Sequence, residues 1–181
     1  MHEEFRPEQS VESFIGVWKR VVTDPRGFFQ DMPIRGGIQA PLLFLVGCLV
    51  CAALGFLVIG PRGFGLSLVF WGTVRSFLYA AVFMLIARHV FSGTGDYEAN
   101  YRIVAYATAP MALMWVPLVG GLTMLYTIFL VIVGMERING FDAVKSVLSV
   151  LLASIVLLAL GWAFGFHHHG YHHGMAMGCH R

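Results

Sequence analysis

The chain has 181 residues, of which 57% are hydrophobic and only 12% are charged. Globular proteins carry about 25% charged residues, so this composition excludes an ordinary soluble domain and indicates an outer surface that faces lipid. The formal net charge is only +2 and no basic stripe is present, so the sequence predicts no nucleic-acid partner.

The first predicted element lies in residues 1–38, a segment that we expect to be cytoplasmic. Residues 10–23 read SVESFIGVWKRVVT, and their apolar side chains recur at helical spacing with charged residues on the other face. The Asp24-Pro25 pair ends this helix. We expect an amphipathic helix that either lies in the cytoplasmic interface, with Trp18 dipping in, or packs against the cytoplasmic ends of the spans.

Five apolar segments follow, and we expect residues 39–166 to form an all-α membrane domain with five transmembrane helices. A spanning helix needs about 20 apolar residues, because the hydrocarbon core is roughly 30 Å thick. The runs 41–60, 65–89 and 144–166 each reach that length.

The third and fourth segments come from one apolar stretch, residues 103–135, which Pro110 and Pro117 interrupt. As a straight helix this stretch would be about 50 Å long, too long for one crossing. We predict two short helices, Ile103–Leu118 and Leu122–Met135, joined by a tight turn that protein or water must shield. One kinked span with a re-entrant piece is the alternative.

Loop charges favour five spans over four. Apart from Arg75, five spans put nine Lys and Arg residues on the cytoplasmic side and two outside, whereas four spans give eight and three. The sequence therefore predicts a cytoplasmic N-terminus and places the tail, residues 167–181, outside the cytoplasm.

Three residue runs occur in a distinctive order: FIGVWKRVVTDPRGFFQDM from Phe14, GTGDYEANYRIVAYATAP from Gly93 and VPLVGGLTMLYTIFLVIVGMERINGFDAVKSVL from Val116. In order and spacing they resemble the Yip family of Ypt/Rab-interacting membrane proteins, over about residues 11–166. The resemblance implies a five-span domain. The short N-terminal segment is similar to that of bacterial members, which implies a bacterial inner membrane and a periplasmic C-terminus. Rab binding carries over onto no residue, and the tail is not part of the family pattern.

Arg75 is the candidate intramembrane polar site, because a charge at membrane depth is costly and by default indicates function. No Asp or Glu lies within the predicted spans. Arg75 either snorkels to the headgroups or lies in a polar cavity where carbonyls and hydroxyls accept its hydrogen bonds. The candidate hydroxyls belong to Tyr79, Tyr106 and Tyr126.

The tail HHHGYHHGMAMGCHR is the candidate metal site. Imidazole suits zinc, copper and nickel, and sulfur ligands add affinity for Cu(I). The alternatives are a tolerated low-complexity end or a pH-sensing segment whose six histidines gain charge together. The candidate ligands are His167, His168, His169, His172, His173, Met175, Met177, Cys179 and His180.

No catalytic constellation or phosphate loop is present, so the sequence predicts that the protein is not an enzyme and requires no cofactor. The role that fits best is membrane organisation or a scaffold for protein partners, with the tail as an accessory metal-binding segment. The rival is a small dimeric transporter or channel for metal or other ions, lined by the broken third span, the short fourth span and Arg75. Gly161 and Gly165 would allow close contact between copies.

Overall fold

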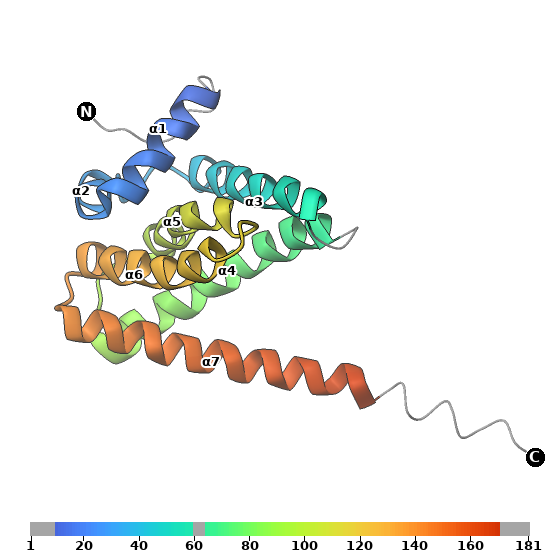
Figure 1. Ribbon diagram of the computed structural model, residues 1–181. Helices are drawn as coiled ribbons and strands as arrows, with labels where there is room; N and C mark the ends of the chain where they lie inside the picture. The colour runs from blue at the N-terminus through green and yellow to red at the C-terminus, as the bar shows by residue number, and fades with distance from the viewer. Residues whose placement is uncertain (1–9, 60–63, 171–181) are drawn as a thin grey trace, which may run out of the picture.

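The computed structural model describes residues 10–59 and 64–170, with side chains described over 11–58 and 65–162. These residues form helices and no strand (Figure 1). In chain order the elements are α1 (Ser10–Thr23), α2 (Pro25–Asp31), α3 (Gln39–Ile59), α4 (Phe64–Phe91), α5 (Tyr97–Ala107), the 3₁₀ helix η2 (Ala109–Leu113), α6 (Val119–Asn139) and α7 (Ala143–Gly170).

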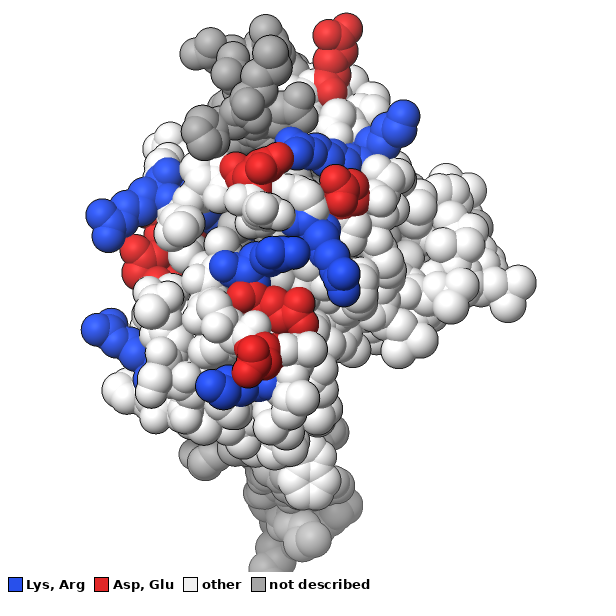
Figure 2. All heavy atoms as spheres, turned by 90° about the vertical axis from the view of Figure 1, so that its left-hand side faces the viewer, with Lys and Arg blue, Asp and Glu red and all other residues white. Residues whose placement is uncertain are grey.

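Four of the described helices, α3, α4, α6 and α7, are long and apolar enough to cross a membrane. Their polar ends meet on the left of Figure 1, where α2, the linker 32–38, the last turns of α4 and α6 and the first turns of α5 and α7 gather. Figure 2 views this charged end face-on, with basic and acidic side chains interspersed. The helices α3 and α7 run away from the charged end, and α4 and α6 run towards it.

The stretch 103–135 is a hairpin, because α5 and η2 pack against α6. The α-helix stops at Ala107, since Pro110 lacks an N–H and its ring restricts the residue before it. The tighter η2 carries the chain past this proline, and Leu118 makes the turn with a left-handed φ of 68°.

The prediction of a short fourth helix is wrong. Helix α6 has 21 residues, from Val119 to Asn139. Gly120 and Gly121 belong to its first turn rather than to the loop, and the polar residues after Met135 continue it until Gly140 adopts a left-handed φ of 66°.

The third of the five predicted spans is the short one. Helix α5 has 11 residues and is about 17 Å long, so it does not reach across a membrane by itself. It is the innermost helix of the bundle, with every residue from Ala99 to Ala107 buried. The described fold therefore contains four candidate spans around a shorter α5–η2 segment, whereas we predicted five spans.

Aromatic rings fill the space around α5. The Tyr106 ring lies 5.0 Å from Phe28 and 5.1 Å from Phe44, measured between ring centroids. The Tyr101 ring stacks on Phe77 at 4.8 Å. These contacts join α2, α3 and α4 to the same short helix, so the centre of the bundle is filled with side chains.

Helix α1 packs on the bundle through Val17 and Val21, which are buried. The Trp18 indole N–H donates to the Ala109 carbonyl of η2 at 2.7 Å. The outer face of α1 exposes apolar Val11 and Ile15 beside its charged residues. The N-terminal segment therefore contacts the bundle through the buried face of α1.

We predict that Gly55→Ala lowers the melting temperature in detergent. A Cβ at Gly55 would collide with the Trp115 indole, which lies directly over the glycine. Gly121→Ala is the matched control, because nothing lies near the added methyl there and the change should stabilise its helix by about 0.5–1 kcal/mol. Equal effects of both substitutions would contradict this packing.

Candidate functional site

A buried arginine organises the charged end. Arg102 of α5 has no exposed side-chain surface and donates to three oxygens. Its guanidinium reaches the carbonyls of Pro33 at 3.0 Å and Gly37 at 2.9 Å, and Glu98 Oε1 at 3.2 Å. The same Glu98 oxygen accepts from the backbone N–H groups of Gly36 and Gly37, both at 2.7 Å. We call these five residues the Arg102 clasp.

The clasp holds the linker between α2 and α3 against α5. Glu98 and Arg102 are four residues apart on one helix face, the spacing that favours an ion pair. The guanidinium also presents a planar fork of donors, which matches several oxygens at once. Arg102 is one of the nine basic residues predicted on the cytoplasmic side, and its buried role was not predicted, although the Glu-x-x-x-Arg spacing is present in the sequence.

An amide pair closes the same end of the bundle. Asn139, at the end of α6, accepts from the Gly95 N–H at 3.1 Å and donates to Asn100 of α5 at 3.5 Å. Asn100 in turn donates to the Asp96 carbonyl at 2.8 Å. A Cβ at Gly95 would lie 2.6 Å from the Asn139 Oδ1 oxygen, so a larger residue here would displace the Asn139 amide.

Asp96 is the N-cap residue of α5 and lies next to the amide pair. Its carboxylate accepts from the Ala99 N–H at 3.0 Å, which caps the helix. Beside it, the Tyr97 hydroxyl donates to the Phe77 carbonyl of α4 at 3.3 Å.

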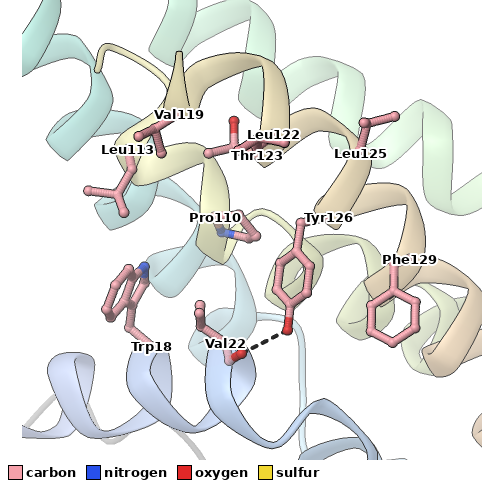
Figure 3. A pocket seen from close by; sticks show the side chains of 10 residues that line it. All are labelled: Trp18, Val22, Pro110, Leu113, Val119, Leu122, Thr123, Leu125, Tyr126 and Phe129. Atoms are coloured by element: carbon pink, nitrogen blue, oxygen red, sulfur yellow. Dashed lines mark hydrogen bonds between the residues drawn. The ribbon is translucent and has the colours of Figure 1, made fainter. Parts of the chain in front are cut away.

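An apolar groove lies between α1, η2 and α6 (Figure 3), with a volume of about 460 Å³. Three polar groups line it, and each already donates to a backbone carbonyl. Trp18 bonds Ala109, Tyr126 bonds Val22 at 2.7 Å, and Thr123 bonds Gly120 at 2.7 Å. The remaining lining is hydrocarbon, so the groove suits an acyl chain better than a polar substrate.

A second apolar groove, of about 490 Å³, lies on the other side of Trp18. Its lining includes Phe14 and Ile15 of α1, Leu54 of α3, and Trp115. Trp18 lines both grooves, so it lies between them where α1 contacts the bundle.

The structure distributes the four residues of the predicted intramembrane site over three helices. Arg75 and Tyr79 are exposed on α4. Tyr106 is fully buried in the aromatic core, and Tyr126 lines the groove of Figure 3. Helix α4 begins at Phe64, so Arg75 lies about 16 Å along the axis from that end. Snorkelling to the headgroups would be easy only if the span started near Trp71, about one turn before Arg75.

The predicted metal site falls mostly outside the described residues. The backbone of His167–His169 belongs to α7, and their side chains are not described. The candidate ligands from His172 to His180 lie beyond residue 170. Among the described side chains, no group of three or more His, Cys, Asp or Glu residues could hold a metal ion.

The sequence model of the Yip1 domain matches residues 19–165, from the middle of α1 to the outer half of α7. The chain belongs to the Yip1 domain family. The predicted resemblance is thereby confirmed. No curated protein and no solved structure matches the chain. Yip1 family proteins are generally non-enzymatic membrane proteins, and the four apolar helices agree with a membrane location. The matched region contains the Arg102 clasp, the amide pair and, apart from Trp18, the lining of the groove of Figure 3.

We predict that Arg102→Met destabilises this Yip1 domain by about 2–3 kcal/mol, because Glu98 and two carbonyls lose a charged hydrogen-bond donor. Glu98→Gln should cost less, since the amide oxygen can still accept from Gly36 and Gly37. Chemical unfolding in detergent measures both, with the exposed Arg88→Met as control. An Arg102→Met protein as stable as the control would show that the clasp contributes nothing.

Proposed function

We propose that this protein is a non-catalytic scaffold that organises the membrane or holds partner proteins. The filled core carries this proposal: α5 is buried over nine consecutive residues, and aromatic rings occupy the centre of the bundle. A carrier needs a polar path between its helices. The surfaces that this bundle offers to other molecules are instead its outward helix faces and its charged end.

We further propose that the protein lies in a bacterial inner membrane with a cytoplasmic N-terminus and a periplasmic C-terminus. Basic side chains at the charged end support this orientation. The directions of the helices support five crossings, with α5, η2 and the turn to Leu118 acting together as the third. One face of this amphipathic helix packs on the bundle through the bond from Trp18 to Ala109, and its exposed apolar residues Val11 and Ile15 support contact with lipid.

A transporter or channel is the second candidate, and the helix break at η2 favours it. Broken helices expose backbone carbonyls that can bind ions at membrane depth. Here, however, the Ala109 carbonyl already accepts from Trp18. A transport path would have to form between copies of the chain, because Arg75 points outward from a single bundle.

The scaffold proposal predicts that liposomes containing the purified protein show no protein-dependent uptake of Zn²⁺, Cu⁺ or Ni²⁺. A metal-sensitive dye trapped inside reports the flux, and circular dichroism confirms that the protein is helical. Uptake that falls in Arg75→Leu would make the protein a transporter and reject the scaffold.

For the tail, we propose accessory binding of Cu, Ni or Zn outside the cytoplasm. The full chain should bind Ni²⁺ in calorimetric titration, and the chain ending at Phe166 should not, because imidazole is the main ligand type on offer. The melting temperature without metal should be the same for both chains. Ni²⁺ binding that survives the truncation would place the metal site elsewhere.

A further inference from the structure

The outward face of α4 carries a charge at membrane depth. Arg75 lies near the middle of this 28-residue helix and its side chain is exposed. Within the described part of the chain, it makes no hydrogen bond or ion pair. A guanidinium at the centre of a spanning helix is costly, so an isolated Arg75 in lipid requires compensation.

The residues around Arg75 lie on one face of α4 and form a continuous stripe along it. Trp71 and Leu78 lie four residues before and three after it, and their side chains are 55% and 46% exposed. Further along the same face, Val82 and Ile86 are buried in the half of α4 nearest the start of α7. The two helices then separate towards their far ends (Figure 1). The stripe that is covered near the charged end is thus open around Arg75.

A carboxylate is the group that would compensate this charge best, because a charge-assisted pair in a low dielectric is strong and can be bidentate. The chain itself has none to offer at this depth. The helices α3, α4 and α7 contain no Asp or Glu, and Glu136 of α6 lies in its last turn at the charged end. A second copy of the chain therefore cannot supply the acid.

From these observations we infer that the α4 face formed by Trp71, Arg75 and Leu78 binds a transmembrane helix of another protein that carries an Asp or Glu at mid-membrane depth. The apolar neighbours would pack against that helix, and Arg75 would select it by charge. This inference rests on the proposed scaffold function and specifies the kind of partner that the scaffold holds.

The test uses three synthetic transmembrane peptides with a polyleucine core and Glu, Gln or Leu at the centre. The full chain and each peptide carry fluorescent labels and share phosphatidylcholine vesicles, where energy transfer reports association. Polar contacts between membrane helices are worth about 1–2 kcal/mol, so the Glu peptide should associate about tenfold more tightly than the Gln peptide. Arg75→Leu should remove that preference, and the exposed Arg88→Leu should retain it.

Three results would overturn the inference. The first is equal association of the Glu and Gln peptides with the unaltered protein, a comparison that no folding defect can affect. The second is energy transfer between two labelled copies of the chain that falls in Arg75→Leu, which would assign the face to self-association. The third is a Glu preference that disappears when phosphatidylglycerol is included, which would assign Arg75 to lipid phosphate.

The metal-flux assay separates this inference from the proposal beneath it. No flux together with no peptide preference would reject only the acidic partner and leave the scaffold standing. Arg75-dependent flux would reject the scaffold as well, whatever the peptides do.

Discussion

The interruption of the third apolar segment is the constraint on which the rest of the fold depends. Pro110 ends regular helix inside an apolar bundle, and backbone groups released at membrane depth must find partners within the protein. Trp18 adds a donor to this region by bonding the Ala109 carbonyl at the start of η2. Together with the Tyr126 bond to Val22 and the buried Val17 and Val21, this bond holds a segment 91 residues away in sequence against the bundle. Two apolar grooves flank its point of contact.

The charged end holds the start of α5, whereas the break lies after its last residue. Arg102 ties the linker 32–38 to α5, and Asn139 ties the end of α6 to the loop before α5. Buried hydrogen bonds of this kind hold elements in one arrangement. Helix α5 is thus fixed at its start by hydrogen bonds and along its length by aromatic packing. A bundle held at both places suits a protein that presents surfaces to partners.

Composition and run lengths were sufficient to predict an all-α membrane bundle, and the order of motifs was sufficient to predict the family. Local predictions failed where the same residue type occurs in more than one kind of structure. The Gly120-Gly121 pair is typical of turns, yet it lies within α6 because Pro117 and Leu118 had already turned the chain. Tyr106 and Tyr126 lie in the predicted spans, but only packing decides that one is buried in the core and the other lines a groove.

Hydrogen–deuterium exchange on Trp18→Phe in lipid nanodiscs tests most directly whether α1 supports the broken segment. Phenylalanine retains an aromatic ring but removes the donor to Ala109. We predict that the backbone amides of residues 109–118 lose protection by about five- to tenfold, although the substitution lies in α1, because a lost net hydrogen bond of about 1–1.5 kcal/mol acts on the opening equilibrium. Unchanged exchange in residues 109–118 would show that the break is stable without α1 and would contradict this account.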